Sequence, residues 1–334
     1  MKNTRIIAMA VVAAATTCAM AQNYIAQEIS VGGFATSISN GVAAGYQGTP
    51  GHATLWTSTD TIDVHPTGYA YSAIYDIFGN TAVGNAGPMP AMWTGASMSL
   101  LSSPFAIYSG RANATDGAQA VGYVYELGVE NASGPIHGII WNLNNGTSVD
   151  LGKDASVSGV RNGMQVGFKS GSKGQTAGFW RGTRQSYVDL HVKGQSSSVA
   201  TDTDGTIQIG YIGLDVRVRN EARPRDIRFY SAGIWSGSAS SFQYLGSTYR
   251  HSFALNIQGD TISGYGNTTD AIGTPKYSHA IAWVGPDRNF VDLHAALPAD
   301  MLTSTTTGID ANGNIIGYGM TTTGAFRSYL WVRQ

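Results

Sequence analysis

Seven tryptophans recur at near-regular intervals along this chain of 334 residues, and their spacing constrains the fold more than any other feature. They are Trp56, Trp93, Trp141, Trp180, Trp235, Trp283 and Trp331. The mean interval is about 46 residues, which is the length of one four-stranded propeller blade. One large ring in each unit indicates that each unit buries a single anchor against its neighbour.

Two glycine positions also recur in every unit. A short first strand leads to a turn such as Asn40-Gly41 or Asp116-Gly117, and such pairs reach positive φ at low cost in tight hairpins. A second glycine follows four or five residues later, usually before an aromatic residue such as Tyr46. A glycine inside a strand indicates a close approach by another group, and we expect the tryptophan ring of the same unit to cover it. These glycines are Gly45, Gly84, Gly122, Gly167, Gly210, Gly264 and Gly317.

The ends of the chain predict how the units are arranged. The last unit stops three residues after Trp331, so it lacks a fourth strand. The segment Tyr24 to Val31 precedes the first full unit and has the pattern of a strand. Pairing this segment with the last unit would remove two exposed sheet edges. We therefore expect an all-β, seven-bladed β-propeller, with blades near residues 35–66, 67–104, 105–152, 153–192, 193–247, 248–301, and 302–334 completed by 22–34.

The repeat resembles a known extracellular family. The best copies, Asp116 to Gly152 and Ile309 to Trp331, are similar to HAF-family repeats, which carry Asn-Gly, Val-Gly-Tyr, His-Ala-x-x-Trp and Asp-Leu-Gly segments. The resemblance covers nearly the whole chain after the leader, although several units lack the histidine of the third strand. It implies export and a repeat scaffold, and it brings no agreed activity.

The first 21 residues have the features of a cleaved signal peptide. Lys2 and Arg5 precede ten apolar residues, and Ala19-Met20-Ala21 supplies the small residues that a signal peptidase requires. The mature chain, 22–334, then begins at Gln22 as a single propeller that is periplasmic, on the cell surface or secreted. Cleavage removes Cys18, the only cysteine, so stability must come from packing rather than from disulfides.

The composition excludes two classes of function. The formal net charge is −1, whereas a protein that binds nucleic acid needs a strongly basic surface. No apolar stretch after the leader is long enough to span a membrane.

Several short motifs could hold metal ions but are better explained by structure. The pairs Asp63/His65, Asp189/His191 and Asp292/His294 fall on outer strands of separate blades, so they cannot converge on one ion and are expected to pair at the surface. The segments that begin at Asp202 and Asp310 resemble parts of calcium loops, but they lack the later glutamate and coincide with hairpin turns. We predict no metal site and no cofactor.

A cluster of arginines in the fifth unit is the strongest local anomaly, because charged residues make up only 12% of the chain. It lies in a long connection between the second and third strands, and the third and sixth units are also long there. Such loops would share one face of the ring. The planar guanidinium group of arginine can form paired hydrogen bonds with carboxylates and phosphates. The alternative is a longer hairpin whose charges pair with one another. The five residues are Arg217, Arg219, Arg223, Arg225 and Arg228.

We find no catalytic motif, and we therefore predict a non-catalytic, exported binding module whose ligand contacts the face with the long loops. Its partner would be an acidic glycan or an extracellular protein. An extracellular polysaccharide hydrolase or lyase, with carboxylates at the mouth of the central channel, is one alternative. A structural component of the cell surface is another.

Overall fold

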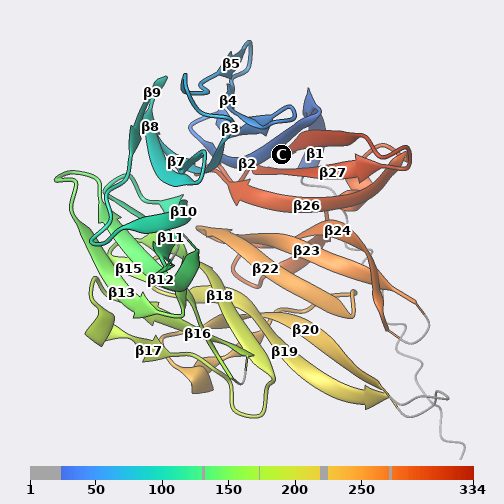
Figure 1. The fold of residues 1–334 in the computed structure, drawn as a ribbon. Helices are drawn as coiled ribbons and strands as arrows, with labels where there is room; N and C mark the ends of the chain where they lie inside the picture. The colour runs from blue at the N-terminus through green and yellow to red at the C-terminus, as the bar shows by residue number, and fades with distance from the viewer. Residues whose placement is uncertain (1–23, 130–131, 173, 219–224, 271–272) are drawn as a thin grey trace, which may run out of the picture.

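The structure, a computed structural model, describes residues 24–129, 132–172, 174–218, 225–270 and 273–334. The expected leader, residues 1–21, lies outside these described residues. Within them, the chain forms seven four-stranded antiparallel sheets that follow one another around a central axis, as Figure 1 shows. The chain is therefore the predicted seven-bladed β-propeller.

In blades 1 to 6, the strands run in chain order from the axis outward. Blade 1 consists of β2 (Gly33–Ser39), β3 (Val42–Gln47), β4 (His52–Trp56) and β5 (Thr61–Asp63). Blade 2 consists of β6 (Ser72–Phe78), β7 (Thr81–Ala86), β8 (Met89–Thr94) and β9 (Ser97–Leu100). Blade 3 consists of β10 (Ile107–Thr115), β11 (Gln119–Leu127), β12 (Ser133–Asn142) and β13 (Ser148–Lys153).

Blade 4 consists of β14 (Ala155–Arg161), β15 (Met164–Gly171), β16 (Gly174–Trp180) and β17 (Val188–Asp189). Blade 5 consists of β18 (Ser197–Thr203), β19 (Gln208–Val218), β20 (Arg225–Trp235) and β21 (Gln243–Tyr244). Blade 6 consists of β22 (His251–Gln258), β23 (Thr261–Thr269), β24 (Pro275–Val284) and β25 (Asn289–Asp292). The 3-10 turns η2 (Arg184–Ser186), η3 (Ala239–Ser241) and η4 (His294–Ala296) accompany the outer strands of blades 4, 5 and 6.

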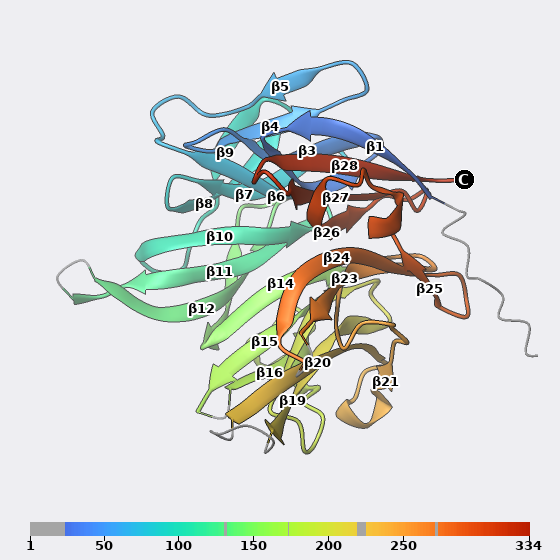
Figure 2. The same ribbon diagram turned by 90° about the vertical axis from the view of Figure 1, so that its right-hand side faces the viewer.

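Blade 7 contains both ends of the described chain. Its strands are β26 (Met301–Ile309), β27 (Ile315–Thr321), β28 (Phe326–Arg333) and, outermost, β1 (Tyr24–Val31). Strand β1 runs antiparallel to β28, with Ala26 opposite Trp331. The blue and red ends of the chain accordingly lie side by side in Figures 1 and 2. The first strand thus joins the last sheet, as the sequence predicts, and the ring has no open blade.

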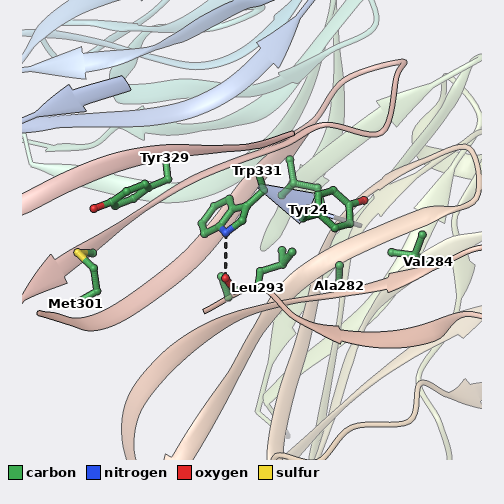
Figure 3. Close-up of a cluster of buried hydrophobic side chains, with 9 residues drawn as sticks. Tyr24, Ala282, Val284, Leu293, Met301, Tyr329 and Trp331 are labelled. Atoms are coloured by element: carbon green, nitrogen blue, oxygen red, sulfur yellow. Dashed lines mark hydrogen bonds between the residues drawn. The ribbon is translucent and has the colours of Figure 1, made fainter. Parts of the chain in front are cut away.

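The repeated tryptophans anchor each blade to the blade before it. Six of the seven are at most 1% exposed, and Trp56 is 4% exposed. The indole N–H of Trp331 donates to the carbonyl of Leu293 in blade 6 at 3.0 Å, as Figure 3 shows. The indole of Trp93 likewise donates to the carbonyl of Val64 in blade 1 at 3.0 Å. The rings of Trp93 and Trp331 therefore combine apolar burial with a hydrogen bond that satisfies the polar edge of the indole.

Blades 4 and 5 bury their tryptophans differently. The indole nitrogens of Trp180 and Trp235 are buried and have no hydrogen-bond partner among the described residues. Instead, Tyr187 packs on Trp180 with ring centroids 5.1 Å apart, and Phe242 packs on Trp235 at 4.7 Å. In these two blades, aromatic packing replaces the hydrogen bond that blades 2 and 7 use.

None of the helices within the described ranges is long and apolar enough to cross a membrane.

Candidate functional site

Each of the seven innermost strands contains a one-residue irregularity at the same place. In β2, for example, the pairing with β3 shifts between Ala35 and Ser37, which leaves Thr36 without a cross-strand partner. Such a bulge bends its strand and turns the extra side chain in a new direction. Here the bulged residues line the cavities on the axis. They are Thr36, Tyr75, Asn113, Ser158, Thr201, Leu255 and Thr307.

The bulges explain the repeated glycine of the second strand and correct one prediction. A Cβ added to Gly45 would overlap the carbonyl oxygen of Phe34 on the innermost strand of the same blade. The same main-chain collision occurs at all seven positions, and the tryptophan of the same blade is not among the nearest atoms at any of them. The prediction that the tryptophan ring covers these glycines is therefore wrong. The ring faces the preceding blade, and the displaced carbonyl beside the bulge occupies the space.

Four of the bulged side chains also form hydrogen bonds with the next blade. Each donates a hydrogen bond to the carbonyl of the residue just before the bulge in that blade. The pairs are Thr36 to Ile74 at 2.8 Å, Asn113 to Val157 at 2.7 Å, Thr201 to Ala254 at 2.8 Å and Thr307 to Ala35 at 2.8 Å. The innermost layer is thus held by side chains as well as by packing, which fixes the wall of the channel.

Two cavities lie one beyond the other between the innermost strands, and they share Tyr75, Leu255, Asn256 and Thr307. The smaller, of about 440 Å³, lies where the innermost strands end and turn into the first hairpins. The larger, of about 820 Å³, opens beside the hairpin of β23 and β24, on the face with the long loops. We refer to this larger cavity as the basin. Its volume lies in the range of about 300–1,000 Å³ that is usual for small-ligand sites.

Three aspartates, Asp76, Asp202 and Asp310, line the smaller cavity, and the first two bond to neighbouring blades. Asp76 accepts hydrogen bonds from the hydroxyl of Ser37 at 2.6 Å in blade 1 and from the main-chain N–H of Thr115 at 2.8 Å in blade 3. Asp202 accepts from the main-chain N–H of Ile257 at 2.9 Å in blade 6. Both carboxylates therefore link neighbouring blades.

Loss of solvent is the main influence on the acidity of these two groups. Part of each side chain faces the cavity, but protein surrounds both. Burial raises the pKa of Asp76, and it raises the pKa of Asp202 to about 7. Arg161 lies at the same end, where it donates to Gln258 at 3.2 Å and covers the ring of Phe78 at 4.8 Å.

The basin has a different chemistry from the smaller cavity. Its aromatic residues come from four blades, and two cations, Arg111 and Lys276, lie among hydroxyl and amide side chains. None of the residues that line the basin, all within the described ranges, is aspartate or glutamate. The aromatic residues are Tyr46, Tyr75, Tyr265 and Tyr318.

Two of these tyrosines are held in place by a phenylalanine on the adjacent innermost strand. Phe34 lies opposite Tyr46 and stacks on it with centroids 5.0 Å apart, and Phe253 lies opposite Tyr265 and stacks at 4.5 Å. Burial raises the pKa of Tyr265 to about 12 and also raises that of Tyr318. At neutral pH these phenols are therefore protonated hydrogen-bond donors on a rigid wall.

The described part of the predicted arginine site lies away from the basin wall and carries paired charges. Arg228 forms two hydrogen bonds with Asp215, at 2.6 and 2.8 Å, and Arg217 lies 3.4 Å from Asp226. Arg225 begins β20. Arg219 and Arg223 lie outside the described residues. These cross-strand pairs are the arrangement expected of a long hairpin with mutually paired charges, and exposed pairs of this kind contribute at most about 1 kcal/mol.

The histidines of the three Asp-x-His pairs contact serine hydroxyls of the next blade. Asp63 accepts from the main-chain N–H of His65 at 2.8 Å, and His65 contacts the hydroxyl of Ser72 in the next blade at 2.8 Å. His191 with Ser198 and His294 with Ser304 repeat this contact between blades at 2.9 and 2.7 Å. Among the described residues, no cluster of histidine, cysteine and acidic side chains could hold a metal ion. The histidines therefore pair with the next blade and not with the aspartates beside them.

The segments that resemble calcium loops form turns. Asp204 accepts from the main-chain N–H groups of Thr206 and Ile207, at 2.7 and 2.9 Å. Asp310 accepts from Asn312 and Asn314 in the same way, at 2.9 Å each. This is the turn chemistry that the sequence favours.

Sequence reasoning missed Arg111, Asn256, Lys276 and Tyr75, which come from four different segments of the chain. The tyrosines that follow the repeated glycines are a signal in the sequence, but their spacing does not show that they face the axis. Arg111 becomes notable only when the blades are aligned on their bulges. In that alignment Arg111 occupies the position that Phe34 and Phe253 occupy in their own blades.

The fold and this site define a seven-bladed β-propeller with a ligand-sized basin at one mouth of its channel. No protein-family model and no curated protein sequence matches the chain. Among solved structures, the chain is similar to the tricorn protease, with a TM-score of 0.56 and 10% identity over 92% of this chain. It spans 34% of that protein, about a third of its length.

Two further structures are similar at lower TM-scores. TolB from Acinetobacter baumannii has a TM-score of 0.44 and 12% identity, covering 77% of this chain and 66% of that one. The β-propeller domain of the Trilobed protease from Pyrococcus furiosus has a TM-score of 0.42 and 10% identity, covering 93% and 94%. At these identities the similarity concerns the fold alone.

Proposed function

We propose that this protein is an exported, non-catalytic binding propeller whose ligand occupies the basin on the face with the long loops. The observation that carries the proposal is the lining of the basin, which combines four tyrosines, two cations and many hydroxyl groups around the central channel. A concave site with a few convergent polar groups on a rigid scaffold is the usual form of a binding site.

The rigidity of the wall supports binding. The hydrogen bonds from the bulged side chains and the stacked pairs of phenylalanine and tyrosine fix the side chains of the wall before a ligand binds. Little conformational entropy is therefore lost on binding. Arg217 lies near the end of β19 and Arg228 near the start of β20, on the same face as the hairpin of β23 and β24. We propose the five arginines of this segment (Arg217, Arg219, Arg223, Arg225 and Arg228) as a second contact, at the rim, for a ligand that extends beyond the basin.

Export and family membership are part of the same proposal. The leader 1–21 and the resemblance to HAF-family repeats support an extracytoplasmic protein of that repeat family. Expression with its leader in a bacterial host, followed by N-terminal sequencing, tests the first point. We expect Gln22 as the first residue, and retention of Met1 would contradict export by cleavage.

Binding is tested by screening the mature chain and two single variants on glycan and protein arrays. Tyr75→Ala removes a ring from the basin, whereas Tyr244→Ala removes a 66% exposed ring from the outer strand of blade 5. We expect wild type and Tyr244→Ala to share their ligands and Tyr75→Ala to lose them. A third variant with all five hairpin arginines changed to serine measures the contribution of the rim. Identical ligand profiles for all proteins would overturn the basin as the site.

One observation favours the enzymatic alternative. Burial raises the pKa of Asp202, in the channel just beyond the basin, to about 7, and such a shift suits general acid–base catalysis. Against it, both oxygens of Asp202 accept main-chain hydrogen bonds, from Thr203 at 2.8 Å and Ile257 at 2.9 Å. Release of reducing ends or unsaturated products from polysaccharide, abolished in Asp202→Asn, would establish an enzyme.

A further inference from the structure

We propose that Arg111 is the anion-binding residue of the basin and that the ligand is an acidic glycan whose uronate carboxylate pairs with its guanidinium. The inference rests on the binding function proposed above and specifies the class of ligand. It depends on how Arg111 is held, on its lack of an acidic partner and on the other groups that share the basin.

The guanidinium of Arg111 is fixed by contacts on three sides. Its central carbon lies 4.6 Å from the ring centre of Tyr75 in blade 2 and 5.4 Å from that of Tyr123, its cross-strand neighbour in blade 3. Its Nε donates to Asn113 at 2.8 Å, and Asn113 is itself held by the carbonyl of Val157 at 2.7 Å. A cation between aromatic rings with one N–H engaged keeps a defined orientation.

Arg111 carries a charge that the surrounding protein does not balance. No carboxylate among the described residues forms an ion pair with it, in contrast to Arg217, Arg228, Arg327 and Arg333. Only Nε has a protein acceptor among the described hydrogen bonds, so its two terminal NH₂ groups remain for a ligand. A half-buried cation without a counterion is costly to the fold unless a bound anion compensates it.

Comparison of the blades indicates that the charge is not needed for packing. The position of Arg111 beside Tyr123 is the position of Phe34 beside Tyr46 and of Phe253 beside Tyr265. Phenylalanine supports the neighbouring tyrosine in blades 1 and 6. Arginine at the equivalent position of blade 3 therefore points to recognition of an anion.

The rest of the basin fits a sugar chain better than an acidic peptide. Stacked tyrosine rings offer flat apolar faces, and protonated phenols, threonines and Asn267 offer hydrogen bonds to hydroxyl groups. The buried Oδ1 of Asn256, which both cavities share, has no hydrogen-bond donor among the described residues and could accept from a ligand hydroxyl. Lys276, on the β23–β24 side, provides a second cation for another acidic unit of the chain.

Titration calorimetry with defined oligosaccharides tests the inference. The probes are oligogalacturonate, a sulfated oligosaccharide, a neutral oligosaccharide of the same length and a polyglutamate peptide. Arg111→Phe copies the packing of blades 1 and 6 without the charge, and Arg111→Gln removes the charge with less bulk. Arg181→Gln is the matched control, because Arg181 also lies over an aromatic ring, Phe179 at 5.8 Å, but lines neither cavity.

We expect wild type and Arg181→Gln to bind oligogalacturonate and both Arg111 variants to bind it at least about tenfold more weakly, because a charge-assisted, two-bond contact is lost. Near-UV circular dichroism and the melting temperature check that the variants are folded. Equal affinity in Arg111→Phe, or preference for polyglutamate or the sulfated probe, would overturn the inference while leaving a binding basin in place. If the ligands that Tyr75→Ala no longer binds are neutral sugars, the inference about Arg111 fails while the proposed binding function stands. If no ligand depends on the basin, the proposed function fails as well.

Discussion

Tyr24, the first described residue, lies opposite Arg333, the penultimate residue of the chain, in the antiparallel pair that completes blade 7. The hydroxyl of Tyr24 also donates to the carbonyl of Gly313 at 3.1 Å. The two ends of the propeller are thus held together by main-chain pairing and by a buried side chain that is only 5% exposed.

Removing residues 22–31 should destabilise the whole ring rather than one end of it. The deletion exposes the edge of β28 and removes Tyr24 from the cluster around Trp331. We expect the melting temperature to fall by more than about 10 °C and the protein to self-associate, measured by calorimetry and size-exclusion chromatography. A synthetic peptide of residues 22–31 should restore both properties, whereas a scrambled peptide should not. A monomeric deletion variant of unchanged stability would contradict this account of closure.

The collision at the repeated glycines predicts a large effect for a single methyl group. Gly264→Ala would drive a Cβ into the carbonyl oxygen of Phe253, so we expect a loss of at least about 2 kcal/mol in the free energy of unfolding. Gly171→Ala is the control, because no atom lies within 4 Å of its Cβ position, and it should change stability by less than about 0.5 kcal/mol. Urea denaturation measures both. Similar values for the two variants would show that the bulge does not impose the glycine.

The two kinds of tryptophan anchor should differ in their response to phenylalanine. Trp283 donates to the carbonyl of Gly246 at 2.5 Å, whereas the indole N–H of Trp235 has no partner among the described residues. Both substitutions lose apolar area, but only Trp283→Phe also leaves a carbonyl without its donor. We therefore expect Trp283→Phe to be more destabilising by about 1 kcal/mol in urea denaturation. Equal losses would mean that the hydrogen bond contributes nothing beyond the burial of the ring.

Acid should weaken the contact between blades 6 and 7. Burial, with a smaller effect from the stacked His279, lowers the pKa of His294 to about 4. Between pH 6.5 and 4 the unfolded chain therefore binds a proton that the native state does not, so stability falls as the pH falls through this range. His294→Gln, which can still accept from Ser304, should remove this dependence.

The measurement is the difference in unfolding free energy between wild type and His294→Gln at pH 5 and at pH 7. Between pH 7 and pH 5, we expect the unfolding free energy of wild type to fall by about 1 kcal/mol or less relative to that of the variant. The effect is small because His294 is partly exposed. The comparison at pH 7 and pH 8 serves as the control and should show no change. A difference that is constant from pH 8 to pH 5 would contradict a neutral, partly buried His294 in the native state.

The sequence predicts the ring well because its anchors are periodic. One tryptophan in each unit and a strand-like segment before the first unit are local features, and they determine the number of blades and the place of Tyr24. The bulges could not be predicted in this way. A bulge is a property of the register between two strands, and its residue varies from Thr36 to Tyr75 to Leu255, so no residue type marks it.

The candidate site was less predictable, because it is assembled from residues of several blades. The density of arginines predicts a site at the hairpin of Arg217 and Arg228, but the charges of these two residues are balanced by carboxylates on the facing strand. Arg111 stands alone in the sequence and has no acidic partner in the described structure. Charge density along a sequence does not distinguish paired from unpaired cations, and only the fold brings Arg111 beside Tyr75.

The position of β1 also has a consequence for how the molecule is made. Strand β1 is synthesised before β2 to β27 but pairs with β28, so β2 to β25 can assemble in order while β1 stays unpaired. Loop-closure entropy places this pairing of distant segments late, after the intervening blades have shortened the distance between them. Completion of the ring is therefore tied to the synthesis of β28, and a chain that stops before this strand has no partner for β1.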